Sequence, residues 1–335
     1  MKNTGRGELR QNNISGDWIL ISPGRGRRPH EFKETRTRKR SPINSCPFEN
    51  PNKAGGGGVI FSDPAGDDWK LQIVPNRYPA VQTEGIWVLD KEDRGPFTVL
   101  PGYGYHELLI TRDHDDNFAA ISKDEAHRVF EAFRSRYKIL ALDKNLSYIS
   151  LFHNWGEKAG ASIYHPHYQL LGVPVIPPGV HRSLSGASAY YKKFKTCAHC
   201  SQNAWELKKK TRVVYSNDKA VVFVPFASKE PFEMRVFPKR HTSFFEETDT
   251  TTMRAVVDAL QVALRRLEKG LKKPDYNFFI HTSPTQNKRA YKHYHWHVEL
   301  VPQTNVSAGF ELGTDMQINP LDPDEAAAFL RRHAK

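Results

Sequence analysis

The chain has 335 residues, of which 39% are hydrophobic and 26% charged, a composition typical of a folded protein large enough for two domains or two similar halves. No run reaches the roughly 18 to 20 consecutive apolar residues of a membrane helix, and residues 1–10 lack the apolar segment of a signal peptide. This excludes a membrane-spanning helical protein and predicts a cytoplasmic location. With 49 Lys and Arg against 37 Asp and Glu, the formal charge of +12 favours an anionic partner, either nucleic acid or phosphorylated small molecules.

Basic residues are concentrated in the first 40 positions. A protein dedicated to nucleic acid would more often interleave such residues with aromatic side chains for base stacking. Both a solvated basic surface and an anion-binding site fit this cluster, whose members are Arg25, Arg27, Arg28, Lys33, Arg36, Arg38, Lys39 and Arg40. The four glycines at 55–58 precede neither a helical pattern nor a Lys-Ser/Thr pair, so they predict a flexible loop and not a phosphate-binding loop.

The first half of the chain predicts a strand, a helix and two further strands. Ser122 and Glu125 form a capping-box pattern, which opens the helix. A glycine-rich turn separates the last two strands. The expected elements in chain order are a strand over residues 106–112, a helix over 122–142, a strand over 148–152 and a strand that carries His165 and His167.

The second half repeats this order. Cysteine precedes the elements of each half, Cys46 in the first and Cys197 with Cys200 in the second. A CxxC pair in a cytosolic protein more often binds metal or performs redox chemistry than forms a disulfide. A duplication is the simplest interpretation, so we expect an α+β fold of two similar halves, residues 1–185 and 186–335, each an antiparallel sheet flanked by helices. The expected elements of the second half are a strand over residues 232–237, a helix over 251–271, a strand over 276–281 and a strand that carries His293, His295 and His297.

The segment between the halves is rich in Pro, Gly and Ser. Over residues 174–188 this composition predicts a crossover or linker. At the other end of the second half, residues 324–332 predict a C-terminal helix.

The two histidine strands share one alternation of side chains. Successive side chains on a strand point to opposite faces, so His165, His167 and Gln169 lie on one face and Tyr168 and Leu170 on the other. A single histidine so placed would more often be structural, but two matching strands in equivalent places of a repeat favour a functional site. The second strand has the same pattern, with His293, His295, His297 and Glu299 on one face and Tyr294, Trp296, Val298 and Leu300 on the other.

Several segments match one known family, and the most specific of them is His165-Pro-His167-Tyr-Gln169. The full set comprises residues 8–10, Trp18, 25–29, 76–80, 104–107, 154–169, 309–311 and Gln317. Together they resemble the galactose-1-phosphate uridylyltransferase branch of the histidine-triad superfamily over nearly the whole chain. The resemblance implies two tandem histidine-triad-like halves and nucleotidyl transfer through a covalent nucleotidyl-histidine.

The resemblance also implies roles for individual residues. His167 would be the nucleophile for the α-phosphorus, because a neutral imidazole can attack near pH 7 without losing a proton. Gln169 would hydrogen-bond a non-bridging phosphate oxygen, and Ser162 and backbone N–H groups near Gly160 would add donors. The remaining substrate contacts implied are Arg28 for the diphosphate, Asn76 for the nucleoside, and Asn154 and Gln317.

Zinc sites are implied as well, and they would fix the histidine strands and thus the aim of the nucleophile. Glu49 departs from the family's CxxC pattern, and a carboxylate in place of a thiolate predicts weaker binding at the first site. The first set of ligands is Cys46, Glu49, His114 and His165. The second set is Cys197, Cys200, His241 and His295, with His199 and His297 as alternative ligands.

The second half departs from the first at the places that matter for chemistry. Trp296 and Glu299 replace Pro166 and Gln169, and a carboxylate at the latter place would repel phosphate. Ser183 stands near where some uridylyltransferases have the carboxylate of a different metal site, which favours the cysteine set here. The second half is therefore expected to support metal binding and the acceptor pocket.

Three hypotheses for function follow. The first is a hexose-1-phosphate uridylyltransferase, in which UDP-glucose leaves UMP on His167 and galactose 1-phosphate accepts it. Residues 309–311 and Gln317 resemble the family's hexose-phosphate contact, which a neighbouring subunit supplies, so a homodimer is expected. Asn305 stands where the family has a basic residue, which fits equally a phosphorylase of ADP-glucose or of a dinucleoside, with inorganic phosphate as acceptor. A nucleotide- or RNA-end-binding module is the third and least favoured, and it predicts binding that weakens steeply with salt.

Overall fold

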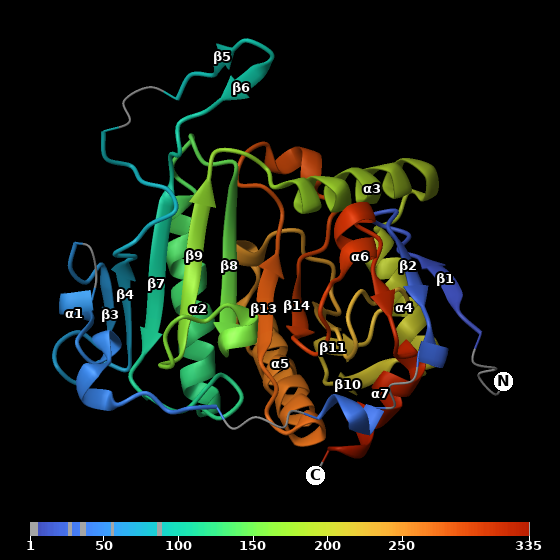
Figure 1. Cartoon of the computed structure of the whole chain (residues 1–335). Helices are drawn as coiled ribbons and strands as arrows, with labels where there is room; N and C mark the ends of the chain where they lie inside the picture. The colour runs from blue at the N-terminus through green and yellow to red at the C-terminus, as the bar shows by residue number, and fades with distance from the viewer. Residues whose placement is uncertain (1–5, 26–28, 34–37, 55–56, 86–88, 335) are drawn as a thin grey trace.

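The computed structural model describes residues 6–25, 29–33, 38–54, 57–85 and 89–334. Its centre is a ten-stranded antiparallel sheet with the order β10-β11-β12-β14-β13-β8-β9-β7-β4-β3 (Figure 1). The strands are β3 (Phe61–Asp63), β4 (Leu71–Pro75), β7 (Tyr105–Thr111), β8 (Tyr148–Trp155), β9 (His167–Val173), β10 (Val213–Ser216), β11 (Ala220–Phe223), β12 (Met234–Pro238), β13 (Tyr276–His281) and β14 (His297–Pro302).

The strand order is mirrored about the central pair of β8 and β13. From this pair the sheet runs through β9, β7, β4 and β3 on one side, and through β14, β12, β11 and β10 on the other. His167 begins β9 and His297 begins β14, so the two histidines occupy matching places in the mirrored order. A duplicated unit would produce this arrangement, and the division of the chain at residue 185 stays a prediction.

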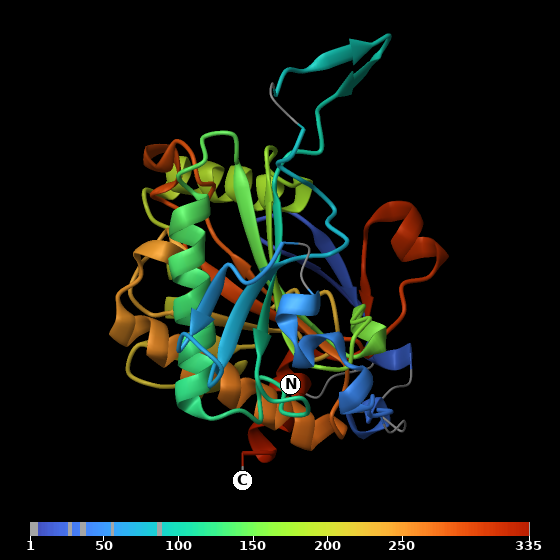
Figure 2. The same cartoon turned by 90° about the vertical axis from the view of Figure 1, so that its left-hand side faces the viewer.

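Two long helices cover one face of the sheet. α2 (Lys123–Leu140) begins at the capping box of Ser122 and Glu125, as predicted, and α5 (Thr250–Leu271) begins at Asp249. Both belong to the same apolar core as Tyr168 and Leu170, which are fully buried as the strand alternation predicts. Figure 2 shows these green and orange helices on one side of the sheet. The opposite face, which carries Gln169, is left for the site.

The open face is partly covered by two further helices, α3 (Pro178–Phe194) and α4 (Ala198–Lys209). α3 occupies most of residues 174–188, so of the two predicted alternatives, a crossover or a linker, the linker is wrong. Pro178 stands in the first turn, where a helix needs no N–H donor from that residue. Gly186 permits close packing, since a Cβ there would lie 1.5 Å from the Ile14 carbonyl oxygen. α4 lies outside the predicted elements.

Smaller elements complete the fold. β1 (Glu8–Gln11) and β2 (Trp18–Ile21) form a second sheet with β15 (Ile318–Asn319), which runs parallel to β2. A hairpin of β5 (Glu92–Arg94) and β6 (Phe97–Val99) projects from the body of the molecule (Figure 1). The remaining helices are α1 (Pro51–Ala54), α6 (Gly309–Thr314) and α7 (Pro323–Arg332), the last of which confirms the predicted C-terminal helix. Within the ranges described, no helix combines the length and apolar character needed to cross a membrane.

Candidate active site and metal centres

The four side chains predicted to bind the first metal converge on one point. Their ligand atoms all lie within 4.8 Å of one another, and they belong to Cys46, Glu49, His114 and His165. Glu49 Oε1 is 2.7 Å from His114 Nδ1 and 3.2 Å from His165 Nδ1. Cys46 Sγ is 3.6 Å from His165 Nδ1. The centre therefore combines one sulfur, one carboxylate oxygen and two imidazole nitrogens.

Hydrogen bonds on the outer side orient both histidines of this centre. His114 Nε2–H donates to the Ser41 carbonyl oxygen at 2.9 Å, and His165 Nε2–H donates to the Thr111 carbonyl oxygen at 2.7 Å. Both Nδ1 atoms then present lone pairs to the centre, which is the second-shell arrangement typical of zinc-binding histidines. Burial lowers the pKa of His165, which favours the neutral imidazole that a metal needs. The residues fit a zinc ion.

The second predicted set converges in the same way, within 4.8 Å, and comprises Cys197, Cys200, His241 and His295. Cys200 Sγ lies 3.3 Å from His241 Nδ1 and 3.4 Å from His295 Nδ1. A hydrogen bond from Cys200, with others from the two histidines, lowers the pKa of Cys197 and favours its thiolate. The donors, two sulfurs and two imidazoles, are the set that structural zinc prefers. The alternative ligands His199 and His297 lie outside this group.

His167 is held in one tautomer. Its Nδ1–H donates to the His165 carbonyl oxygen at 3.0 Å, which leaves the Nε2 lone pair free. Burial, with a smaller contribution from the positive charge of Arg38, outweighs the opposing effect of the hydrogen bond to the His165 carbonyl and lowers the pKa of His167 to about 4. The imidazole is therefore neutral near pH 7, the form that can attack phosphorus.

The first metal centre and the nucleophile are joined by Phe48. This residue lies between the ligands Cys46 and Glu49, in a short 3-10 turn. Its ring meets the edge of the His167 ring at a centroid distance of 5.0 Å. A metal bound by Cys46 and Glu49 would therefore hold this turn in place, and with it the Phe48 ring that packs against His167.

Gln169, Asn76 and His106 form a polar cluster beside the nucleophile strand. The Ala80 N–H donates to His106 Nδ1 at 3.1 Å, so the proton of this ring is on Nε2. That N–H donates to Gln169 Oε1 at 2.9 Å, which leaves the amide N–H groups of Gln169 available to a phosphate oxygen. The Asn76 amide is 3.2 Å from the same His106 nitrogen. Sequence reasoning assigned no role to His106, although it lies in one of the matching segments.

The glycine-rich turn after β8 is anchored by the second half of the chain. Gly156 and Gly160 both have positive φ angles, of 93° and 83°. Asp275, immediately before β13, accepts a hydrogen bond from the Lys158 N–H at 2.8 Å. The N–H groups of residues 159–161 bond within the turn, so most of the backbone donors expected near Gly160 are already engaged.

Asn154 is oriented by a cross-strand amide pair. The Asn277 amide, directly opposite on β13, donates to Asn154 Oδ1 at 2.8 Å. The amide nitrogen of Asn154 is thereby turned away from Asn277, and it lies 3.9 Å from the position that a Cβ on Gly160 would occupy. This places a potential donor at the turn.

Arg38 is a further cation near the nucleophile. Its guanidinium lies 3.6 Å from the Trp155 ring centroid and 4.6 Å from that of Tyr164, and it donates to the Tyr164 carbonyl oxygen at 3.1 Å. Nη1 is buried without a hydrogen-bond partner among the residues described. The sequence placed Arg38 only within a general basic cluster, because nothing in that cluster distinguishes one arginine from the next.

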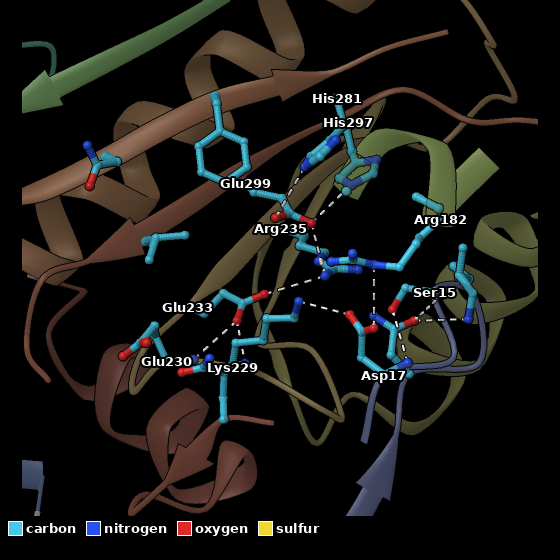
Figure 3. A pocket seen from close by; sticks show the side chains of 18 of the residues that line it. Ser15, Asp17, Arg182, Lys229, Glu230, Glu233, Arg235, His281, His297 and Glu299 are labelled. Carbon is cyan, nitrogen blue, oxygen red and sulfur yellow. Dashed lines mark hydrogen bonds and ion pairs between the residues drawn. The ribbon is translucent and has the colours of Figure 1, made fainter. Parts of the chain in front are cut away.

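The matching histidine of the second half has a different neighbour. His297 Nδ1–H donates to the His295 carbonyl oxygen at 3.1 Å, as in His167, but its Nε2 lies 3.3 Å from Glu299 Oε1. Glu299 also pairs with Arg235 at 2.9 Å (Figure 3). A carboxylate thus occupies the place that an attacking lone pair would need.

Comparison with known proteins identifies the family. Residues 62–332 match the family model described as Domain of unknown function (DUF4921). The chain is a member of the DUF4921 family. It is 32% identical over 330 residues to ADP-glucose phosphorylase from Arabidopsis thaliana, covering 97% of this chain and 92% of that protein. It is 26% identical over 332 residues to galactose-1-phosphate uridylyltransferase from Thermotoga maritima, covering 97% and 98%.

A solved structure agrees with these relatives. The crystal structure of ADP-glucose phosphorylase from Arabidopsis thaliana with bound ADP-glucose matches with a TM-score of 0.83 and 30% identity, covering 97% of this chain and 99% of that chain. The expected relationship to galactose-1-phosphate uridylyltransferases and their phosphorylase-like relatives is confirmed. This DUF4921 member is accordingly a transferase enzyme of the nucleotidyltransferase type.

The structure brings together some of the predicted site residues of this DUF4921 protein and not others. The two metal sets each converge, and Gln169 and Asn76 meet at His106. Ser162 lies exposed in the loop before β9. Gln317 lies elsewhere: it accepts from Ser307 Oγ at 3.3 Å and lines a cavity with His297. Among the described residues, no hydrogen bond joins it to His167. Arg28 lies outside the described residues.

Proposed function

We propose that this enzyme transfers a nucleotidyl group from a nucleotide sugar through a covalent intermediate on His167. The observation that supports the proposal is the neutral, buried imidazole whose Nδ1–H is bonded to the His165 carbonyl oxygen and whose Nε2 is free. When Nε2 forms a bond to phosphorus, positive charge develops on the ring. The carbonyl oxygen at Nδ1 stabilises that charge.

The reaction proceeds in two displacements. His167 Nε2 attacks the α-phosphorus, a P–N bond forms, and the bond to the bridging oxygen breaks, so that sugar 1-phosphate leaves with its electron pair. An oxygen of the acceptor phosphate then attacks the same phosphorus and the P–N bond breaks, which restores His167. Gln169, Asn154 and Arg38 are proposed to hydrogen-bond or neutralise the phosphate oxygens.

Zinc is proposed as a structural metal at both centres. Bound to Cys46, Glu49, His114 and His165, it would hold the turn that carries Phe48 against His167. Bound to Cys197, Cys200, His241 and His295, it would stabilise the start of α4 and the segment before β14. Neither role requires the metal to touch substrate.

For the substrates, we favour ADP-glucose as donor and inorganic phosphate as acceptor. The similarity to ADP-glucose phosphorylase, at 32% identity, exceeds that to galactose-1-phosphate uridylyltransferase, at 26%, over the same share of the chain. Asn305 adds support, because it lacks the positive charge that the uridylyltransferases place near the hexose phosphate. UDP-glucose with galactose 1-phosphate, the pair favoured by the motif resemblance alone, is the second candidate.

A matrix of two donors and two acceptors tests the substrates. ADP-glucose or UDP-glucose is supplied with phosphate or galactose 1-phosphate, and the sugar 1-phosphate and nucleotide products are quantified. We expect ADP-glucose with phosphate to give glucose 1-phosphate and ADP at the highest kcat/KM. A higher value for UDP-glucose with galactose 1-phosphate would favour the second candidate.

Labelling without acceptor tests the intermediate. Donor labelled at the α-phosphorus should leave an acid-labile, base-stable label on the peptide that contains His167. The His167→Gly variant should carry no label, whereas His297→Gly, the matched change in the second half, should keep it. An unlabelled peptide in an enzyme that turns over would reject covalent catalysis.

A homodimer in which each subunit supplies Gln317 to its partner's site is part of the proposal. Within one chain, no hydrogen bond joins Gln317 to His167 among the described residues, which supports a contribution across an interface. The variants His167→Gly and Gln317→Ala should each be impaired, and dissociating and reassociating a mixture should restore up to about a quarter of the wild-type sites. A monomer by light scattering, or no recovery on mixing, would remove the dimer from the proposal.

A further inference from the structure

A cavity of about 720 Å³ lies where α5 and α7 end next to each other. Figure 1 shows these two ends beside the C-terminus, at the end of the molecule opposite to the β5–β6 hairpin. Phe329 of α7 belongs to the same buried apolar core as Leu271 of α5, so the core holds the two ends together. α5 covers the face of the sheet opposite to Gln169, and no residue that lines this cavity belongs to the site around His167.

The side chains that line this cavity carry a strong excess of positive charge. Among the residues described, no ion pair neutralises any of its five cations. On the neighbouring helix α2, by contrast, Arg134 pairs with Glu131 and Arg136 pairs with Glu107. The cavity therefore concentrates part of the chain's formal charge of +12. The five cations are Arg265, Arg266, Lys269, Lys272 and Lys273, and the one carboxylate that lines the cavity is that of Glu268.

This single carboxylate has a partner outside the cavity. Glu268 accepts a hydrogen bond from the Asn117 amide at 2.5 Å. Burial raises the pKa of Glu268, which disfavours its charged form. A further cation, Arg331 of α7, lies close enough to repel the cations of α5, since burial and the positive charge of Arg331 lower the pKa of Arg266. The described residues therefore leave most of the positive charge here uncompensated.

The end of α5 accounts for only a small part of this charge. The C-terminus of a helix carries roughly half a negative charge, which a single cation offsets. Lys272 and Lys273 both have left-handed backbones, with φ angles of 59° and 56°. This conformation is unfavourable for most L side chains, and such residues are concentrated at binding sites. Both lysines are exposed, as are Arg265 and Lys269, so a ligand can reach all four.

We propose that this cavity binds an oligophosphate, a small anion of several linked phosphates, at a site separate from the transfer site. The cavity volume lies within roughly 300 to 1,000 Å³, the range of small-molecule sites. Lysine and arginine side chains form strong, charge-assisted hydrogen bonds with phosphate oxygens, and five cations fit several phosphates better than one. No Phe, Tyr or Trp lines the cavity, so it lacks the rings on which nucleic-acid bases stack. The proposal goes beyond the transfer reaction and does not depend on which donor or acceptor His167 serves.

Titration calorimetry of the whole chain with inorganic tripolyphosphate tests the site, with inorganic orthophosphate as the single-phosphate comparison. The His167→Gly variant is used, and each titration is repeated in saturating ADP-glucose and in saturating UDP-glucose, so that a nucleotide sugar competes for the transfer site. We expect saturable binding of tripolyphosphate in all three conditions, about tenfold tighter than that of orthophosphate. Absence of saturable binding, equal affinity for orthophosphate or displacement by either nucleotide sugar would overturn the proposal.

Two matched double variants test whether the anion binds at the end of α5. Lys269→Gln with Lys272→Gln removes two charges from the last turn and C-cap of α5, and it should weaken tripolyphosphate binding by about tenfold or more. Lys208→Gln with Lys210→Gln removes two charges from the last turn and C-cap of α4, and it should change the affinity by less than about twofold. All four lysines are exposed, so both variants should keep the wild-type melting temperature within a few degrees. Equal losses in the two variants, or no loss in the α5 variant, would count against this site.

A single-stranded oligonucleotide is the last comparison. We expect it to bind more weakly than tripolyphosphate, because the cavity offers no ring for base stacking. Tighter binding of the oligonucleotide that is lost in the Lys269→Gln and Lys272→Gln variant would overturn the proposal in favour of a nucleic-acid surface.

Discussion

Replacement of Gly156 by alanine should lower the free energy of unfolding in two ways, by straining the backbone and by breaking the hydrogen bond between the Lys158 N–H and Asp275. A Cβ at this position would lie 1.9 Å from Asp275 Oδ1, so the carboxylate must move and the 2.8 Å bond from the Lys158 N–H is lost. Loss of a hydrogen bond to a charged group costs about 1.5 to 3 kcal/mol. The backbone of Gly156, with φ of 93° and ψ of 161°, lies in a region almost restricted to glycine, which adds about 1 to 3 kcal/mol for an L side chain. The expected loss in the free energy of unfolding is about 3 to 6 kcal/mol.

Gly160→Ala is the matched control. Its φ is also positive, but the nearest atom to a Cβ there is Asn154 Nδ2 at 3.9 Å, so only the backbone term of about 1 to 2 kcal/mol applies. Urea denaturation followed by tryptophan fluorescence measures both variants. In an Asp275→Ala background, the cost of Gly156→Ala should fall to its backbone strain of about 1 to 3 kcal/mol. Equal costs for the two glycines in the wild-type background, or an unchanged cost of Gly156→Ala without Asp275, would refute the anchoring argument.

Three other outcomes are expected. Glu49→Cys should raise zinc retention against a chelator by about 10- to 100-fold, measured by elemental analysis, while Glu92→Cys on the exposed hairpin should not. Phe48→Ala should lower kcat by about tenfold with zinc content intact, because it removes the ring that packs against His167. The control Phe61→Ala, on β3, should leave kcat unchanged. A drop in zinc content that matches the drop in kcat would contradict this prediction. Burial raises the pKa of Glu230 from 4.5 to about 7 in the folded state. The contribution of this carboxyl to the free energy of unfolding is therefore complete below pH 4.5 and is lost as pH rises through 7. Glu230→Gln should remove up to about 3 kcal/mol of this decline in urea denaturation, whereas Glu92→Gln should not.

Periodicity predicted the parts of the fold in which the local sequence and the final structure agree. Tyr168 and Leu170 are buried and Gln169 is not, as the alternation of β9 requires. The Ser122 capping box begins α2 at the predicted residue. In each case the signal lies within a few residues of the element it specifies.

The segment that became α3 shows where this reasoning failed. Proline, glycine and serine predict a linker because each disfavours the interior of an isolated helix. Here the proline stands in the first turn, and Gly186 is needed where the helix touches the backbone at Ile14. Packing against a segment more than 170 positions earlier in the chain outweighs local propensity, and no short window of sequence contains that contact.

The candidate site divides in the same way. The family resemblance implied both metal sets, and a CxxC pair also marks the second, whereas the first has Glu49 in place of a cysteine; both sets converge. Arg38 reaches Tyr164 across 126 positions, and Asp275 reaches Lys158 across 117. In the sequence, Arg38 is one of many arginines and Asp275 is a carboxylate before a strand like many others. Only the tertiary structure distinguishes these two residues from others of their type.

The parallel pairing of β2 with β15 has a consequence for synthesis. The Leu20 N–H donates to the Gln317 carbonyl oxygen at 3.0 Å, and the Ser22 N–H donates to the Asn319 carbonyl oxygen at 2.8 Å. β2 is therefore one of the first strands to leave the ribosome, whereas its partner β15 is one of the last. During translation β1 and β2 can form only a marginally stable hairpin. The segment between them lines the same cavity as His297 and Gln317, so that cavity can close only after release of the finished chain.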